Sequence, residues 1–261
     1  MEKITSLQNT RVKGVVALIE KARERRSSGL FTVEGAREAG LAQQAGYSLK
    51  TLFVCPEIFG AANTPPKAEQ IFEVSRSVFE KLAYRSGSDG LLAVVEQRDL
   101  SLERLQLSEN PFVIVLEAVE KPGNLGAILR TADAAKADAV IVCDLACDVY
   151  NPNAVRSSIG CIFTVQVACG TSAEALEFLR KRKIKTLAAE LQASAWYHET
   201  DMRQPCAIVM GAEADGLTDF WLRNADARIK IPMRGAIDSL NVSVSTAVLT
   251  FEAMRQRGFE L

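Results

Sequence analysis

The second half of the chain alternates short apolar runs with longer segments of mixed apolar and polar residues. The apolar runs predict strands at residues 112–116, 139–143, 162–167, 186–189, 206–210 and 227–231. The mixed segments predict helices at residues 125–135, 173–182, 217–224 and 242–257. Strands that are apolar throughout are typical of a parallel sheet buried on both faces. The alternation therefore predicts a mostly parallel α/β sheet with helices on both of its faces.

A smaller α/β domain is predicted for residues 1–98. Val12, Val15, Val16 and Ile19 share one face of a helix, which the charged run 20–26 is expected to extend as far as Gly29. Further strands are predicted at residues 31–35, 49–54, 71–74 and 91–95, and further helices at residues 36–45 and 77–84. Residues 99–110 are polar and precede a proline, which indicates a linker. The second domain then covers residues 111–261.

The charge balance restricts where a nucleic acid could bind. The chain is 48% hydrophobic and 24% charged, with a formal net charge of −1, so its overall charge predicts no polyanionic partner. Local basic clusters are therefore the candidates, and the first thirty residues contain one. Its candidate phosphate contacts are Lys21, Arg23, Arg25 and Arg26. The alternative for this cluster is a solvated helix face.

Three other features indicate a cytoplasmic protein without a metal. The six cysteines form no CxxC pair and several lie within apolar runs, which favours buried reduced thiols over disulfides or zinc ligands. His198 is the only histidine, so metal ligation is not predicted. The start lacks the apolar region of a signal peptide, and no apolar run approaches the ~20 residues of a membrane span.

The first of three chemically suggestive loops covers residues 120–130. It follows a buried strand and opens a helix, and its glycines allow a ligand to approach the backbone. Asn124 lies near the helix start, where its side chain could cap the helix, and Arg130 follows six residues later. The alternative is a capped helix with a surface arginine. The loop is neither a dinucleotide-binding GxGxxG turn nor a phosphate-binding P-loop.

Two further loops follow strands near the end of the chain. In residues 209–217, Gly211 lies at the carboxyl end of a strand, where ligands bind in open α/β sheets. Glu213 follows it, with interaction at a helix N-terminus as the alternative role. In residues 229–245, small polar residues interrupt apolar surroundings, which favours a functional loop. Ser239 or Asn241 could cap the last helix.

Together and in this order, the loops resemble the three motifs of the SpoU (TrmH-like) branch of the SPOUT methyltransferases. The matching positions are Asn124, Gly126 and Arg130 in the first motif, Gly211, Glu213 and Gly216 in the second, and residues 231–235 and 239–243 in the third. Residues 150–160 also fit, and the resemblance covers residues 111–261. Residues 31–35 and the helix after them resemble, more weakly, a ribosomal-protein-like RNA-binding domain. Ala212, Ala214 and Cys161 depart from the residues common in the branch.

The resemblance implies a parallel α/β domain closed by a trefoil knot, which is a rare exception to the usual chain connections. It also implies an S-adenosylmethionine-dependent enzyme that methylates a ribose 2′-hydroxyl, with ribosomal RNA favoured over transfer RNA by the two-domain layout. The cofactor is expected to lie against Gly211, Ile231 and Leu240, with Met210 and Met233 beside them. The branch dimerises through this domain, so a homodimer is expected, with the RNA spanning both subunits.

The resemblance also assigns five residues to catalysis: Asn124, Arg130, Glu213, Ser239 and Asn241. Arginine stays protonated in proteins, so Arg130 is better suited to hold a phosphate, or to lower the pKa of the hydroxyl, than to act as a base. Two alternatives stay open: a non-catalytic RNA-binding or ribosome-assembly protein on the same scaffold, and methylation of a base nitrogen. The intact catalytic positions argue against the first.

Overall fold

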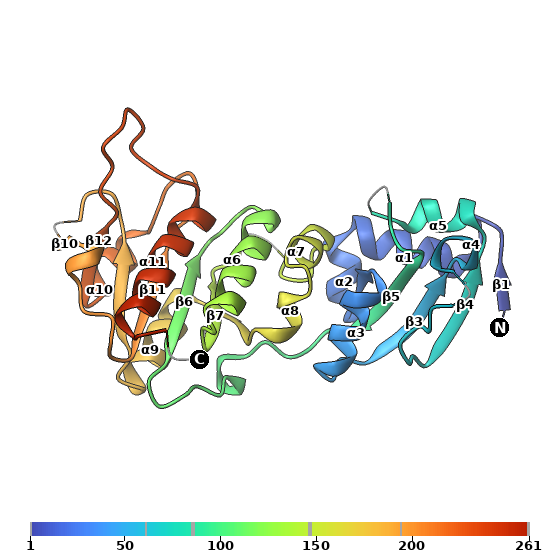
Figure 1. Ribbon diagram of the computed structural model, residues 1–261, viewed down its shortest axis with the longest axis horizontal. Helices are drawn as coiled ribbons and strands as arrows, with labels where there is room; N and C mark the ends of the chain where they lie inside the picture. The colour runs from blue at the N-terminus through green and yellow to red at the C-terminus, as the bar shows by residue number, and fades with distance from the viewer. Residues whose placement is uncertain (1, 61, 85–86, 146–147, 194, 260–261) are drawn as a thin grey trace. The chain divides into compact units, whose positions relative to one another are not determined.

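The computed structural model describes residues 2–60, 62–84, 87–145, 148–193 and 195–259 (Figure 1). These residues form two compact units, each of which is described by itself. The first unit consists of Met1–Arg98 and Asp148–Thr164, and the second of Asp99–Cys147 and Val165–Leu261. The segment Asp148–Thr164 therefore packs within the first unit, although in the sequence it lies inside the region 111–261.

The first unit is built on a five-stranded mixed sheet in the order β1-β4-β3-β5-β2. Its strands are β1 (Glu2–Ile4), β2 (Leu30–Glu34), β3 (Leu49–Val54), β4 (Gln70–Val74) and β5 (Leu91–Glu96). Strand β4 pairs in parallel with β1 and β3, whereas β5 is antiparallel to both β2 and β3. The predicted smaller α/β domain is therefore confirmed, with strand directions that the sequence pattern did not specify.

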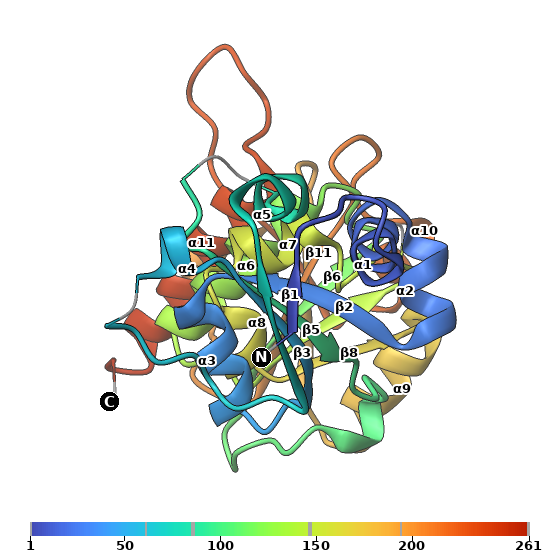
Figure 2. The same cartoon turned by 90° about the vertical axis from the view of Figure 1, so that its right-hand side faces the viewer.

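Helices cover both faces of this sheet. They are α1 (Thr10–Glu20), α2 (Ala22–Ser28), α3 (Ala36–Gln44), α4 (Pro56–Phe59), α5 (Arg76–Leu82), α7 (Pro152–Ser157) and α8 (Cys161–Thr164). Apolar residues of α1 and α5 pack with Phe53, Phe72 and Leu92 in one core cluster. On the opposite face Phe31 contacts the rings of Tyr150 and Phe163, which belong to the Asp148–Thr164 segment. Figure 2 shows α1 and α3 on opposite sides of the strands.

The predicted continuous first helix is wrong, because the chain breaks at Lys21. Lys21 has an extended backbone (φ −121°, ψ 113°) between α1 and α2. The buried Arg25 donates from its guanidinium to the carbonyl oxygens of Leu18 (2.6 Å) and Ile19 (3.2 Å), the last turn of α1. These carbonyls lack partners within their own helix, so Arg25 satisfies them where α1 ends. Gly29, with φ 66°, ends α2 as predicted.

The second unit contains a seven-stranded sheet in the order β10-β12-β9-β11-β6-β7-β8, in which neighbouring strands are parallel. Its strands are β6 (Phe112–Glu117), β7 (Ala139–Cys143), β8 (Val167–Gly170), β9 (Lys185–Ala189), β10 (Ala195–Trp196), β11 (Cys206–Met210) and β12 (Ala227–Lys230). Strands β6, β7 and β11 are buried throughout. This confirms the predicted parallel sheet with apolar central strands.

Four α-helices cover this sheet: α6 (Pro122–Ala134), α9 (Ser172–Lys181), α10 (Asp219–Asn224) and α11 (Val242–Gln256). Residues of α9 and α10, including the fully buried Trp221, pack in one core cluster with the sheet. Helices α6 and α11 pack against each other (Figure 1). A predicted strand at 162–167 is wrong: Cys161–Thr164 is the short helix α8 of the first unit, and β8 begins at Val167.

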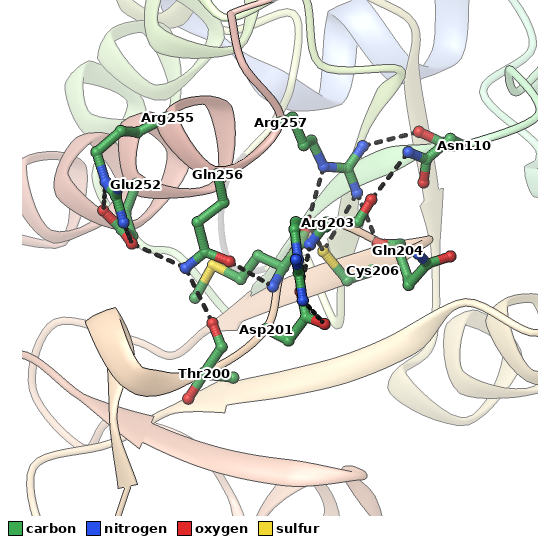
Figure 3. A network of polar contacts seen from close by, with 11 residues as sticks. Asn110, Thr200, Asp201, Arg203, Gln204, Cys206, Glu252, Arg255, Gln256 and Arg257 are labelled. Carbon is green, nitrogen blue, oxygen red and sulfur yellow. Dashed lines mark hydrogen bonds and ion pairs between the residues drawn. The ribbon is translucent and has the colours of Figure 1, made fainter.

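The end of α11 is tied to the segments that precede β6 and β11. The Arg257 guanidinium donates to the carbonyl oxygens of Asn110 (2.7 Å), Met202 (2.8 Å) and Gln204 (2.8 Å) (Figure 3). One helical position earlier, Gln256 donates to the Thr200 carbonyl and accepts from the Met202 backbone N–H. These bonds fix the C-terminal end of the helix whose other end enters the candidate site.

Candidate active site

A cavity of about 780 Å³ lies at the carboxyl ends of the neighbouring strands β12, β9, β11 and β6. Segments far apart in the chain line it: Lys121 just before α6, residues 189–192 after β9, residues 210–217 after β11, and parts of the β12–α11 connection between residues 229 and 245. This edge of a parallel sheet is where ligands bind in open α/β folds. The volume lies in the range of small-molecule and cofactor sites. The three predicted loops therefore converge on one cavity.

Gly211 allows the loop after β11 to fold tightly back on itself. Ala212 and Gly216 exchange two backbone hydrogen bonds of 3.0 Å, so the residues between them form a closed turn. A Cβ atom on Gly211 would lie 2.1 Å from the carbonyl carbon of Gly216 and 2.3 Å from the nitrogen of Leu217. Any side chain at position 211 would therefore displace the turn that forms this wall of the cavity.

All five residues predicted to hold a cofactor line this cavity: Met210, Gly211, Ile231, Met233 and Leu240. Met210 is buried and Leu240 is 37% exposed, so the lining runs from the sheet core to the protein surface. Apolar side chains and glycine backbone at the wall, with polar groups at the rim, are the usual composition of a cofactor pocket.

Three of the predicted catalytic residues form a continuous hydrogen-bonded chain. Asn124 donates from Nδ2 to Glu213 Oε1 (2.5 Å), and its Oδ1 accepts from Asn241 Nδ2 (3.2 Å). Each of the three loops contributes one member. Asn241 caps α11, since its Oδ1 accepts from the Ser243 backbone N–H at 2.9 Å. The predicted capping by Asn241 is thus confirmed, and the chain joins the helix starts of α6 and α11 to the turn after β11.

The predicted capping of α6 by Asn124 is wrong. Helix α6 begins at Pro122, with Lys121 as the N-cap residue, so Asn124 lies within the first turn. Glu213 instead holds the two residues that precede the helix, since its carboxylate accepts from the backbone N–H groups of Glu120 (3.1 Å) and of the N-cap residue Lys121 (3.4 Å). A carboxylate at a helix N-terminus is favoured by the helix dipole.

Hydrogen bonding keeps Glu213 ionised. Its partial burial raises the pKa, but the hydrogen bonds from Asn124 and from the backbone N–H groups of Glu120 and Lys121 lower it by more. The net pKa therefore lies below the ordinary glutamate value. All three donors stabilise the charged form. Glu213 is thus a fixed negative charge that holds two loops together.

The other two predicted catalytic residues differ in position. Ser239 lines the cavity and is exposed. Arg130 lies on the exposed side of α6, two turns from its start, and is not among the residues that line the cavity. Within the described part of the chain, no hydrogen bond or ion pair of Arg130 is found. Its charge is therefore available to an anionic ligand.

The predicted RNA contacts separate into exposed and buried residues. Lys21, Arg23 and Arg26 are exposed at the α1–α2 break and along α2. Arg25 is only 2% exposed, and its Nε donates to Asp148 Oδ2 at 2.6 Å. The predicted phosphate contact of Arg25 is therefore wrong, because its charged group is buried and already paired with Asp148.

The sequence reasoning missed the segment after β9. Residues 189–192 line the cavity beside Ile231, and Leu249 of α11 forms part of its wall. The segment could have been found, since residues 186–189 were predicted as a strand of the same parallel sheet. Its carboxyl end must lie at the same edge as the ends of β6 and β11.

The buried Glu117 was also missed. This residue ends β6, is 2% exposed, and accepts from the Thr218 backbone N–H (2.8 Å) and hydroxyl (2.6 Å). Ser172 at the start of α9 also donates to it (3.2 Å), and the same hydroxyl accepts from Trp221 Nε1 (2.9 Å). Glu117 therefore fixes Thr218, which follows the turn that begins at Gly211. A single acidic residue at the end of an apolar run gave no sequence signal of this role.

The described residues contain neither a metal-binding cluster nor a membrane-spanning helix. Within them no group of three or more His, Cys, Asp or Glu side chains is placed to hold a metal ion. Over the same ranges, no helix combines the length and apolar character needed to cross a membrane. Cys55, Cys143 and Cys206 are buried thiols, while Cys147 lies outside the described residues.

Fold and site together define an α/β enzyme domain with a cofactor-sized pocket beside a cluster of polar side chains. The family model of the SpoU rRNA methylases matches residues 111–251, and the chain belongs to that family. Residues 9–93 match the model of the MRM3-like substrate binding domain. The family match contains all three loops and every residue of the hydrogen-bonded chain.

Curated relatives and solved structures extend the similarity over nearly the whole chain. The chain is 29% identical to a 23S rRNA (uridine(2479)-2′-O)-methyltransferase of Streptomyces viridochromogenes, covering 98% of this chain and 92% of the relative. It is 35% identical to the 23S rRNA (guanosine-2′-O-)-methyltransferase RlmB of Bordetella pertussis, covering 72% and 79%. An AdoMet-bound rRNA methyltransferase structure from Sinorhizobium meliloti is 30% identical, with a TM-score of 0.87 and 97% of each chain covered.

Proposed function

We propose that this protein transfers a methyl group from S-adenosylmethionine to a ribose 2′-hydroxyl of ribosomal RNA. One observation carries the proposal: three loops separated in sequence enclose one cavity, and Asn124, Glu213 and Asn241 join them through side-chain hydrogen bonds. Family membership and relatives named as 23S rRNA 2′-O-methyltransferases support the reaction type. A ribosomal RNA substrate implies a cytoplasmic enzyme.

The cavity fits S-adenosylmethionine in size and lining. At about 780 Å³ it can enclose a ligand of this size, and Gly211 permits the tight turn that forms one of its walls. We assign Ile231, Leu240, Met210 and Met233 to its apolar walls. The bound cofactor supplies an electrophilic methyl group, while the protein supplies binding and orientation.

The catalytic residues divide into those that shape the site and those that meet the RNA. Glu213 and Asn241 fix Asn124 through hydrogen bonds, so the amide is preorganised at the rim of the cavity. The Glu213 carboxylate is occupied by three donors, which makes it unsuited to take the hydroxyl proton. Arg130 is exposed and protonated, so we assign it to an RNA phosphate next to the target ribose. We assign Ser239 to the rim of the cavity, on the loop between β12 and α11.

Residues 1–98 act as the RNA-binding domain in this proposal, with 99–110 as linker and 111–261 as the methyltransferase domain. The match of residues 9–93 to a substrate-binding model supports this division. Lys21, Arg23 and Arg26 are exposed cations that suit phosphate contacts.

A homodimer and a trefoil knot are also part of the proposal. Val244 (48% exposed) and Phe251 (42% exposed) leave apolar surface on α11, which packs beside α6. Large exposed apolar side chains on a helix that borders the site suit a subunit interface. Sedimentation velocity of the wild type and a Phe251→Glu variant tests this: a dimer that the substitution dissociates is expected, and a monomeric wild type contradicts it.

The function is tested by transfer of tritium from labelled S-adenosylmethionine into 23S rRNA of a strain that lacks the gene. Nuclease digestion and mass spectrometry of the product should give a 2′-O-methylnucleoside. Arg130→Ala should abolish transfer, while Arg223→Ala, which removes an exposed arginine of α10, should not. A base-methylated product would overturn the ribose assignment. Cofactor binding without transfer into any RNA pool would favour an assembly protein.

A further inference from the structure

A second depression of about 350 Å³ adjoins the cofactor cavity, and we call it the Trp196 hollow. Trp196 of β10, Lys230 at the end of β12 and residues 235–238 of the following loop line it. It shares Leu191, Lys230, Ile231, Met233 and Asp238 with the cofactor cavity, whereas Trp196 and residues 235–237 line the hollow alone. Figure 1 shows the β12–α11 connection, which forms one wall, extending beyond the sheet. None of the five predicted catalytic residues lines this depression.

The hollow exposes large apolar side chains. Ile237 is 66% exposed, Leu191 is 56% exposed and Trp196 is 36% exposed. The second tryptophan of the chain, Trp221, is fully buried, so exposure of this kind is specific to Trp196. A cluster of exposed apolar side chains at the mouth of a functional cavity is typical of a ligand-binding surface.

The charged side chains that line the Trp196 hollow indicate which kind of ligand it binds. Lys230 Nζ lies 4.6 Å from the centroid of the Trp196 ring, and among the described residues Lys230 has no carboxylate within ion-pair distance. An aromatic face beside a free cation is the combination that binds single-stranded nucleic acid, through base stacking and phosphate contact. Asp238 also lines the hollow, and a carboxylate can accept from the amino group of a base.

We propose that Trp196 and Lys230 bind an unpaired nucleotide of the substrate RNA that flanks the methylated nucleotide. This inference rests on the proposed function. The hollow meets the cofactor cavity at Leu191 and Ile231, whereas Lys121, Glu213 and Asn241 line the other part of that cavity. The nucleotide in the hollow is therefore a neighbour of the reacting ribose. The base stacks on Trp196 and its phosphate pairs with Lys230.

Steady-state kinetics separate this role from cofactor binding. With 23S rRNA purified from a strain that lacks the gene, Trp196→Ala should raise the KM for RNA about tenfold, as expected for loss of one base stack. The Kd for S-adenosylmethionine, measured by calorimetry without RNA, should be unchanged. Trp196→Phe keeps an aromatic face and should retain a KM within about threefold of the wild type. Lys230→Gln should weaken RNA binding and reduce its salt dependence.

Fluorescence gives a direct readout of contact. In a Trp221→Phe variant, Trp196 is the only tryptophan, so the same 23S rRNA should quench the emission and protect it from acrylamide. Quenching by S-adenosylmethionine alone, together with a weaker cofactor Kd in Trp196→Ala, would overturn the proposal in favour of an adenine site. Emission that RNA leaves unchanged would also overturn it. Absence of methyl transfer by the wild type would instead refute the proposed function, and the fluorescence result would still decide whether RNA occupies the hollow.

Discussion

Asn124 and Glu213, 89 residues apart in the chain, are joined by a hydrogen bond of 2.5 Å from Nδ2 to Oε1. The bond links the first turn of α6 to the closed turn after β11. Because Glu213 also accepts from two backbone N–H groups at the start of α6, one carboxylate sets the spacing of both loops. Asn124 completes the arrangement by accepting from Asn241, which caps α11.

Asn124→Ala should lower kcat about a hundredfold while changing the Kd for S-adenosylmethionine by less than about threefold. The substitution removes both bonds of the amide, and a small misplacement of reacting groups can cost this much in rate. Methyl transfer to 23S rRNA measures kcat, and calorimetry measures the Kd. Asn153→Ala is a control, because this asparagine lies on α7 of the other unit. A loss confined to cofactor affinity would contradict the positioning role.

Gly211→Ala should abolish cofactor binding and destabilise the fold by about 1–3 kcal/mol. Its Cβ would lie within 2.3 Å of the Gly216–Leu217 backbone, so the turn must open. Gly235→Ala is the matched control, since its Cβ would meet nothing within 4 Å. Calorimetry and thermal unfolding of the two variants provide the comparison. Equal cofactor affinity in both would show that the turn after β11 is not a wall of the site.

Glu117→Gln should weaken cofactor binding about tenfold. The glutamine amide group can no longer accept at one of the two positions where Thr218 and Ser172 donate, so a buried donor loses its partner and the turn exit shifts. The structure offers a matched control in Asp226→Asn, because Asp226 accepts from the Thr186 backbone N–H and hydroxyl before β12, outside the cavity lining. Both Thr186 donors bind one oxygen of Asp226, which the asparagine Oδ1 can replace, so only Glu117→Gln should change the cofactor Kd.

Arg25 and Arg26 should respond in opposite ways to replacement by alanine. Arg25→Ala removes the charged donor from Asp148 Oδ2 and from two carbonyl groups, so a loss of about 3–5 kcal/mol in unfolding free energy is expected. Arg26→Ala removes an exposed cation and should leave stability within about 0.5 kcal/mol, while reducing the salt dependence of RNA binding. Denaturant unfolding and binding at several salt concentrations measure the two effects. A stable Arg25→Ala variant with weakened RNA binding would reverse the assignment.

The sequence pattern located the parts of the fold that are apolar throughout. The predicted strands 139–143 and 206–210 agree with β7 and β11 residue for residue. Such runs have few alternatives in a parallel sheet. The short apolar run at 162–167 was misassigned, because helix and strand periods cannot be distinguished over so few residues. The break at Lys21 depends on Arg25 reaching back to α1, a tertiary contact that local propensity does not encode.

The site was predictable to the extent that its residues belong to the three loops. Asn124, Glu213 and Asn241 are brought together as the motifs suggested, although Asn124 does not cap α6 and Glu213 binds the backbone just before that helix. The sequence could not place Arg130 relative to the cavity, because helix rotation decides which side of α6 it faces. Trp196 gave no motif signal, and its exposure beside Lys230 becomes evident only once β10 pairs with β12.

Arg257→Ala should destabilise the protein by about 3 kcal/mol, whereas Arg255→Ala should cost less than about 1 kcal/mol. Arg257 donates to carbonyl oxygens of Asn110, Met202 and Gln204, all of which lose a charged donor in the variant (Figure 3). Arg255 instead forms a bidentate pair with Glu252, but the arginine side chain is 62% exposed and Glu252 keeps Gln256 Nε2 as a donor, so the loss is smaller. The two arginines lie two residues apart at the end of the same helix, so they differ mainly in these partners.

Because Arg257 ties α11 to the segments before β6 and β11, its loss should also weaken cofactor binding at the other end of α11. Urea unfolding and calorimetry of both variants test this, and similar stabilities would show that α11 is held by its packing on α6 alone.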